Sequence, residues 1–293
     1  MKLCELTIPF PAHAGEIVGE RLENESGIST MGYSIDTERK TPDVSRLRLY
    51  FTDRDDAVRH IDRIEELFRS LNLPCAIEQK LLDEDHYLSA YRSFLKPYLL
   101  ERLIWIVPFA RDQFDHHAGR RAVFIDHQYA FGTGTHATTH LALSLLVKFV
   151  KRKHTPGRML DIGCGSGILA VTAALFGYSD ITAIDVEEAA IGCTADNARA
   201  NNVIIPRIMR GSVETVAGEQ FSLVLMNIET EIILSLIERT AALVAPGGVL
   251  ILSGILRERK REVRDALKQL PFSIVRERSR GDWHAMHLKR RPA

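Results

Sequence analysis

Apolar and polar positions in the first part of the chain alternate between strand and helix patterns. Two segments carry apolar residues at helical spacing, residues 12–24 and residues 53–71. Four segments read as short strands, at residues 3–9, 31–37, 46–51 and 76–81. The resulting order is strand, helix, strand, strand, helix, strand. This order predicts a ferredoxin-like α+β domain with an antiparallel sheet over residues 1–84.

The later part of the chain alternates strands with helices in a regular way. Helical patterns cover residues 187–202, 229–243 and 257–270, and apolar strands lie between them. The last two strands, residues 272–277 and 282–288, follow each other without a helix and predict a hairpin. Such an alternation predicts a parallel sheet with helices on both faces. We expect this second domain to span residues 130–293.

Residues 85–129 read as a connector between the two domains. A short helix is predicted at residues 87–95, and strands are predicted at residues 103–107 and 122–125. The charged residues between those strands predict an exposed turn.

A glycine-rich turn follows the strand that ends at Ile162. Gly163, Gly165 and Gly167 can take positive φ and let a ligand approach the backbone at the start of the next helix. The following strand ends in Asp185, about 20 residues further on, where a carboxylate can accept hydrogen bonds from ribose hydroxyls. This pattern predicts a site for a nucleotide-type cofactor.

The residue pattern of the glycine turn narrows the choice of cofactor. Ile168 stands where the dinucleotide fingerprint carries its third glycine, which argues against NAD. A G-x-G-x-G turn followed by an acid at the end of the next strand resembles the S-adenosylmethionine site of Rossmann-like methyltransferases. Those sites have no pyrophosphate to bind.

Two further segments place polar residues near the same sheet edge. Residues 129–140 form a glycine and threonine turn before an apolar helix, and the apolar strand 221–228 carries Asn227 near its end. Open parallel sheets bind their ligands at the carboxyl ends of the strands. Asn227 is therefore a candidate functional residue, although it could serve only to cap the helix that begins near residue 229.

With these motifs the chain resembles the ribosomal protein L11 methyltransferase (PrmA) family over nearly its whole length. The family's marks are A-F-G-T-G-T-H-x-T-T, D-x-G-x-G-S-G-I-L, N-I, P-G-G and S-G-I-L, found here at residues 130–139, 161–169, 227–228, 246–248 and 253–256. The resemblance implies a class I, Rossmann-like methyltransferase domain with a mostly parallel seven-stranded sheet and a terminal antiparallel strand. It also implies that the preceding ferredoxin-like domain recognises a protein substrate.

The resemblance further implies a reaction and a set of site residues. A lysine or amino-terminal nitrogen of a large-subunit ribosomal protein, free or on the ribosome, would displace the methyl group of S-adenosylmethionine. Asn227 would be catalytic, because its carbonyl can accept the amine's hydrogens and aim the nitrogen lone pair. Asp161 would order the glycine turn through backbone amides. The residues implied at the cofactor are Thr135, His136, Thr139, Gly163, Gly165, Asp185 and Asn227.

Two other functions stay open at this point. Asp85-His86 and His127-Gln128 depart from the family's usual D-W and P-G pairs, so a methyltransferase acting on another protein, RNA or a small molecule remains an alternative. A cofactor-binding protein without catalysis is the second alternative, and Asn227 argues against it. Direct RNA contact is not indicated, because residues 46–51 lack the aromatic spacing of an RNA-recognition motif.

Composition adds few constraints. The 293 residues suit about two domains, and a formal net charge of zero argues against a strongly electrostatic nucleic-acid binder. The sequence shows no signal peptide and no apolar run long enough for a membrane span, so we expect a cytoplasmic monomer without a membrane partner. Its four cysteines form no C-x-x-C pair, and no metal site is predicted.

Several charged or titratable residues near the motifs carry separate hypotheses. His136, His140 and His284 are candidates for removing the amine's proton, although a lone histidine is more often structural. Glu229 and Glu231 follow Asn227 closely and could hold a cationic substrate at the mouth of the site. Both are also explained as the acidic first turn of a helix.

Overall fold

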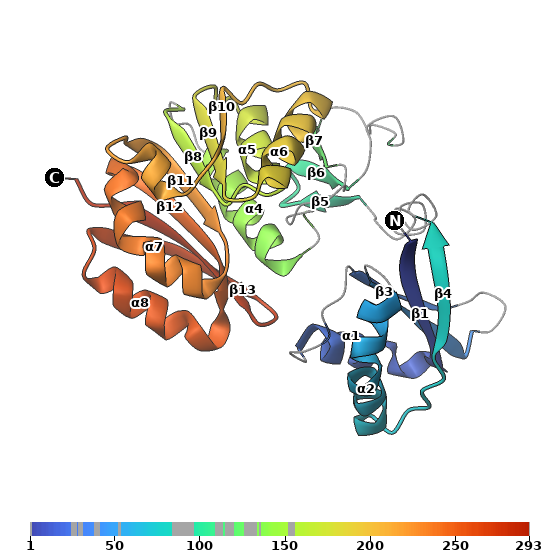
Figure 1. Ribbon diagram of the computed structural model, residues 1–293. Helices are drawn as coiled ribbons and strands as arrows, with labels where there is room; N and C mark the ends of the chain where they lie inside the picture. Colours follow the sequence, from blue (N-terminus) through green and yellow to red (C-terminus); the bar gives the residue numbers. More distant parts are fainter. Residues whose placement is uncertain are drawn as a thin grey trace. The chain divides into compact units, whose positions relative to one another are not determined.

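The structure is a computed structural model that describes most of the chain. The described residues are 2–24, 28, 32–37, 42–51, 54–83, 97–108, 114, 120–125, 134, 136–151 and 156–292. Contacts divide the chain into two compact units, Met1–Leu95 and Lys96–Ala293 (Figure 1). Each unit has hydrophobic core residues of its own.

Unit 1 has the predicted ferredoxin-like arrangement. Its elements are β1 (Lys2–Pro11), the 3-10 turn η1 (Ala12–Ala14), α1 (Gly15–Asn24), β2 (Gly32–Thr37), β3 (Val44–Phe51), α2 (Arg54–Ser70) and β4 (Glu78–Asp83). The strands lie in the order β2-β3-β1-β4, and every neighbouring pair is antiparallel. Cys4, Leu6, Ile8 and Phe10 alternate along β1 and are buried in one cluster with residues of both helices. This alternation is what a sheet covered on one face requires.

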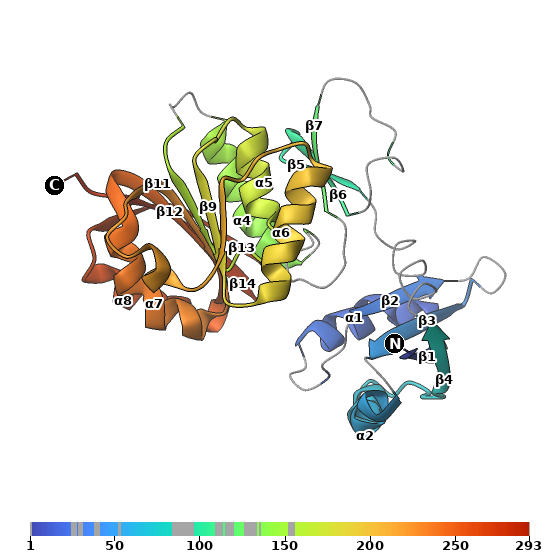
Figure 2. The same cartoon turned by 45° about the horizontal axis from the view of Figure 1, so that its top comes forward.

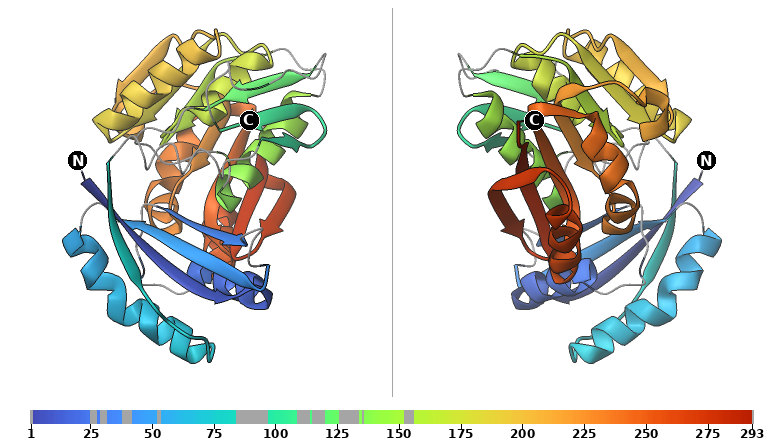
Figure 3. Two further views of the ribbon diagram at one scale, coloured as in Figure 1. Left: turned by 90° about the vertical axis from the view of Figure 1, so that its right-hand side faces the viewer. Right: turned by 90° about the vertical axis from the view of Figure 1, so that its left-hand side faces the viewer.

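Unit 2 contains the predicted seven-stranded sheet, in the order β10-β9-β8-β11-β12-β14-β13. Its strands are β8 (Met159–Ile162), β9 (Ile181–Asp185), β10 (Arg207–Arg210), β11 (Phe221–Asn227), β12 (Val244–Leu256), β13 (Phe272–Arg280) and β14 (Trp283–Arg290). The first five strands in this order, from β10 to β12, are parallel to one another. The last strand, β14, is antiparallel to both β12 and β13. Figure 3 shows the β13–β14 hairpin in red, at one end of this sheet.

Helices cover both faces of this sheet, as predicted (Figures 1 and 2). One side carries α4 (Ala137–Val150), α5 (Ile168–Leu175) and α6 (Glu188–Ala200), and the other carries α7 (Thr230–Leu243) and α8 (Lys260–Lys268). The described part of unit 2 also contains the 3-10 turns η3 (Val213–Val216) and η4 (Arg257–Arg259). Alternate residues of the central strands enter opposite cores, as Met159 and Leu160 of β8 do. The fold class predicted from the sequence is confirmed.

A small second sheet packs against the α4 and α5 side of unit 2. It consists of β5 (Tyr98–Leu100), β6 (Ile104–Val107) and β7 (Arg121–Phe124), in that order. Leu100, Ile106 and Val123 belong to the same core cluster as residues of α4 and α5. The strands β6 and β7 match the two strands predicted in the connector. The helix predicted at residues 87–95 lies outside the described residues, and the predicted domain boundaries remain predictions.

None of the described helices has both the length and the apolar character needed to cross a membrane.

Candidate active site

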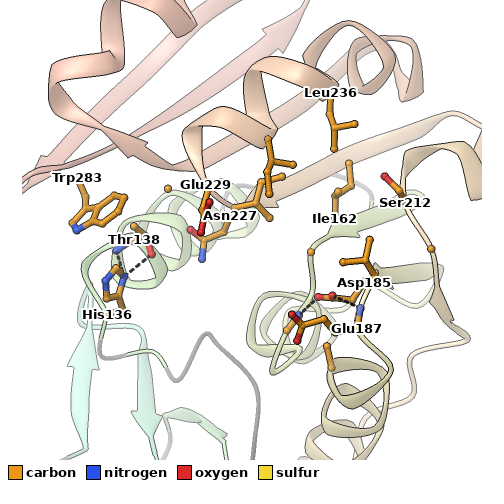
Figure 4. Close-up of a pocket in the computed structure, with 18 residues that line it drawn as sticks. His136, Thr138, Ile162, Asp185, Glu187, Ser212, Asn227, Glu229, Leu236 and Trp283 are labelled. Atoms are coloured by element: carbon orange, nitrogen blue, oxygen red, sulfur yellow. Dashed lines mark hydrogen bonds between the residues drawn. The ribbon is translucent and has the colours of Figure 1, made fainter. Parts of the chain in front are cut away.

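A cavity of about 520 Å³ opens in unit 2 where β8, β9 and β11 end. Its volume lies in the range of small-molecule sites. Figure 4 shows the labelled side chains in two groups, one near Asp185 and one near Asn227. We call these the glycine end, with Gly163, Gly165 and Asp185, and the asparagine end, with His136, Asn227, Glu229 and Trp283.

The glycine end depends on backbone conformations that favour glycine. Gly163, Gly165 and Gly167 have φ values of 69°, 52° and 74°. A Cβ atom on Gly163 would lie 2.4 Å from Cγ2 of Ile228, and one on Gly167 would lie 2.8 Å from Cγ2 of Thr194. Side chains at these two positions would therefore collide with the cavity wall or the neighbouring helix.

Asp185 joins the glycine turn to the start of the next helix. Its Oδ2 accepts a hydrogen bond from the Gly165 amide at 2.9 Å, and its Oδ1 accepts one from the Glu187 amide at 3.0 Å. A carboxylate has about four lone-pair sites, so these two bonds fix its orientation and leave acceptor capacity for a ligand. This arrangement fits the predicted role of binding ribose hydroxyls.

Asp161 stabilises the start of α5, the helix that follows the glycine turn. Its side chain is fully buried, and Oδ2 accepts a hydrogen bond from the Ala170 amide at 3.1 Å. It thereby caps α5, because the N-cap residue Gly167 has no side chain to do so. Asp161 was predicted to bond amides of the glycine turn, and the structure shows its hydrogen bond slightly later in the chain, in the first turn of α5. Burial raises the pKa of Asp161 to about 7.

Asn227 is held in place with one acceptor atom unused. Its Nδ2 donates to Oγ1 of Thr139 at 3.4 Å, whereas its buried Oδ1 has no hydrogen-bond partner within the described part of the chain. A buried polar atom without a partner costs about 1–3 kcal/mol. Asn227 therefore does not cap α7, and its carbonyl oxygen is available to a donor in the cavity.

The start of α4 supplies another wall of the asparagine end. His136 is the N-cap residue, and its Nδ1 accepts a hydrogen bond from the Thr138 amide at 3.4 Å. Its ring meets the Trp283 ring edge to face, with 5.4 Å between the centroids. Thr138 is also bonded to β12, because its carbonyl accepts a hydrogen bond from the Ser253 hydroxyl at 2.7 Å.

Five of the seven residues implied by the family resemblance line this one cavity: His136, Gly163, Gly165, Asp185 and Asn227. Thr139 is fully buried and contacts Asn227, so the structure places it behind the cavity wall. Thr135 lies outside the described residues. Direct contact of Thr139 with the cofactor remains a prediction.

The other two candidate histidines have surroundings of their own. His140 stacks on Tyr98 with 5.6 Å between the ring centroids, and burial lowers its pKa to about 4. His284 lies between Ser279 and Glu277, and burial lowers its pKa as well. Neither is among the described residues that line the cavity. Of the three candidates, His136 is the one at the site.

The lining of the cavity is acidic. Asp185, Glu187 and Glu229 line it, and the described lining includes no lysine or arginine. Such a lining disfavours the phosphates of a dinucleotide and favours a ligand with positive charge. S-adenosylmethionine carries a sulfonium cation and a ribose, so this acidic cavity with its glycine turn fits it. No group of three potential metal ligands occurs among the described residues.

The sequence reasoning missed several lining residues. Trp283 comes from β14, and Gly211 and Ser212 follow β10. Gly211 and Ser212 carried a usable signal, because a glycine and a serine directly after a parallel strand lie at the same sheet edge as Asp185. Trp283 carried no such signal, because it lies far from Asn227 along the chain and no local pattern predicts that the two residues share a cavity.

Comparisons with known proteins agree with these observations. The family model described as ribosomal protein L11 methyltransferase (PrmA) matches residues 5–291. A ribosomal protein L11 methyltransferase from Trichlorobacter lovleyi is 29% identical over 300 residues, covering 98% of both chains. One from Acetivibrio thermocellus is 32% identical over 209 residues, covering 71% of this chain and 65% of that relative.

A solved structure from the same family also resembles this chain. The crystal structure of a ribosomal protein L11 methylase from Lactobacillus delbrueckii subsp. bulgaricus aligns with a TM-score of 0.60 and 28% sequence identity. The alignment covers 67% of this chain and 98% of that one.

Proposed function

Because the chain belongs to the ribosomal protein L11 methyltransferase family, we propose that it transfers methyl groups from S-adenosylmethionine to amino groups of ribosomal protein L11. The acceptors are lysine side chains, the amino terminus, or both. The ferredoxin-like unit recognises the protein substrate, and the enzyme acts as a monomer.

One observation carries the proposal beyond family membership. The buried Oδ1 of Asn227 has no partner among the described residues, and it borders an acidic cavity next to a glycine turn. Transfer to a hydroxyl or thiol needs a base that takes up its proton, which an amide oxygen cannot do, whereas a neutral amine is already nucleophilic and needs only to be oriented. The site therefore favours nitrogen as the atom that receives the methyl group.

The residues of the chain have separate roles in this reaction. S-adenosylmethionine supplies an electrophilic methyl group on a good leaving group. The glycine turn and Asp185 hold the nucleoside part, and Asn227 orients the amine so that it attacks in line. Trp283 and His136 close the asparagine end and limit the access of water. The chain thus contributes mainly orientation.

The proposal can be tested by transfer of labelled methyl groups. Purified ribosomes and free large-subunit proteins, both from cells that lack this enzyme, are incubated with labelled S-adenosylmethionine and the protein. Ribosomal RNA is treated in parallel. Label in L11 that disappears with Asn227→Ala would support the proposal. Label in RNA, or in another protein alone, would contradict the assigned substrate.

A further inference from the structure

Glu229 and Glu231 lie close together in sequence and have different surroundings. Glu231 forms an ion pair with Arg259, with 2.6 Å between Oε2 and Nη1. Glu229 lines the cavity, and its carboxylate has no hydrogen bond or ion pair to any residue in the described part of the chain. Arg259 also pairs with Glu262, but of the two acidic residues Glu229 is the one without a cation partner in the described part of the chain.

The backbone around Glu229 is fixed by its neighbours. The Thr230 hydroxyl donates to the Gly254 carbonyl at 3.0 Å and accepts from the Leu256 amide at 2.9 Å. A Cβ atom on Gly254 would lie only 2.0 Å from the Ile228 carbonyl oxygen, so the two segments are in very close contact. Glu229 is the N-cap residue of α7, yet its side chain forms no capping bond.

The Glu229 carboxylate lies on the same side of the cavity as the Asn227 amide (Figure 4). An alkylammonium group has three hydrogens, enough to donate to both side chains at once. The aromatic ring of Trp283 lines the same end, and aromatic rings attract cations. Carboxylate, amide oxygen and aromatic ring together suit a positively charged amine.

We infer that Glu229 binds the acceptor as an ammonium ion and so selects lysine-like or amino-terminal acceptors over neutral ones. The inference rests on the proposed function, because it assigns the substrate class of the same site. Methyl transfer needs the neutral amine, so the bound ammonium ion first releases a proton to solvent, and the carboxylate acts before that step, when the acceptor binds. Its contribution belongs to the affinity for the acceptor and leaves the affinity for S-adenosylmethionine unchanged.

The test measures binding without transfer. A short acetylated peptide with a central lysine, and the same peptide with norleucine, are titrated by NMR into protein saturated with S-adenosylhomocysteine. Wild type, Glu229→Gln and Glu231→Gln are compared. Glu231→Gln is the matched control, because it removes the same charge from the start of the same helix.

We expect the wild-type protein to prefer the lysine peptide by about fivefold, the upper end of the range for an exposed charge pair. The preference falls to about twofold in Glu229→Gln, persists in Glu231→Gln, and shrinks with added salt because exposed charges are screened. Since the assay involves no transfer and no ribosomal protein, it gives its answer even if L11 proves not to be the substrate.

Three results would overturn the inference. The first is a wild-type protein that shows no preference for lysine, including one that binds neither peptide at millimolar concentration. The second is a Glu229→Gln variant that retains the full preference. The third is a Glu229→Gln variant with weakened binding of S-adenosylhomocysteine, which would assign the carboxylate to the cofactor's own ammonium group.

Discussion

The two ends of the cavity are built in different ways. The glycine end is made by the backbone of one strand, turn and helix, with Asp185 of the next strand bonded to the Gly165 amide of the turn and to the Glu187 amide before α6. The asparagine end is made by side chains that come from separate segments of unit 2. Substitutions at the glycine end should therefore disturb backbone conformation and cofactor binding together. Substitutions at the asparagine end should change the chemistry and leave the fold intact.

The largest effect is expected from Gly163→Ala. The added Cβ would meet Ile228 at 2.4 Å, and alanine disfavours the φ of 69°. We expect a loss of unfolding free energy of roughly 3 kcal/mol and no measurable cofactor binding. Thermal unfolding and calorimetric titration with S-adenosylmethionine measure the two effects.

Gly177→Ala is the matched control for that substitution. Gly177 has a φ of 99°, and an added Cβ would find no atom within 4 Å. It should lose only about 1 kcal/mol and bind the cofactor normally, because the backbone strain remains while the collision is absent. Equal losses in the two variants would show that contact with Ile228 does not matter.

Asn227→Ala should give the next largest effect. Removing the carbonyl that orients the amine is expected to lower the transfer rate at saturating substrates about 100-fold. Affinity for S-adenosylmethionine should stay within about twofold of the wild-type value, because we expect Asn227 to contribute less than about 0.5 kcal/mol to cofactor binding. Single-turnover kinetics give the rate. A variant that transfers normally would remove Asn227 from the reaction.

Asp185→Asn should weaken cofactor binding by about tenfold. An asparagine carbonyl can accept one of the two backbone amides, but its NH2 group would face the other amide as a second donor. The transfer rate at saturating cofactor should recover to nearly the wild-type value. If saturation fails to restore transfer, Asp185 has a role beyond binding.

A separate prediction concerns stability and pH, through Asp161. Its pKa of about 7 in the folded protein exceeds the ordinary value of 3.8, so folding takes up a proton between about pH 4 and pH 7. The free energy of unfolding should therefore fall as the pH rises through that window. Asp161→Asn keeps an acceptor for Ala170 and should flatten this dependence in urea unfolding at pH 5 and pH 8. An unchanged slope would contradict the assignment.

Sequence reasoning reached the glycine end more completely than the asparagine end. Gly163, Gly165 and Asp185 belong to consecutive elements, so local pattern and strand order were enough to bring them together. Trp283 reaches the cavity only because β14 inserts between β12 and β13, a strand order that no local pattern reveals. Likewise, the direction of each side chain at the start of α4 follows from packing, which places Thr138 in the cavity and Thr139 behind Asn227.

The acidic pair shows the same limit. Spacing alone gave Glu229 and Glu231 equivalent roles, and the structure separates them because Arg259 of η4, which also pairs with Glu262, bonds Glu231 and not Glu229. The three-residue strand β5 was not predicted, since so short a segment carries no periodic signal.

The claim that the two ends act independently is tested most directly by one paired measurement. Affinity for S-adenosylmethionine and the single-turnover transfer rate at saturation are determined on the same samples of wild type, Asp185→Asn and Asn227→Ala. We predict weaker binding with recovered transfer for Asp185→Asn, and normal binding with lost transfer for Asn227→Ala. Loss of both properties in both variants would show that the cavity works as one unit and would contradict this account.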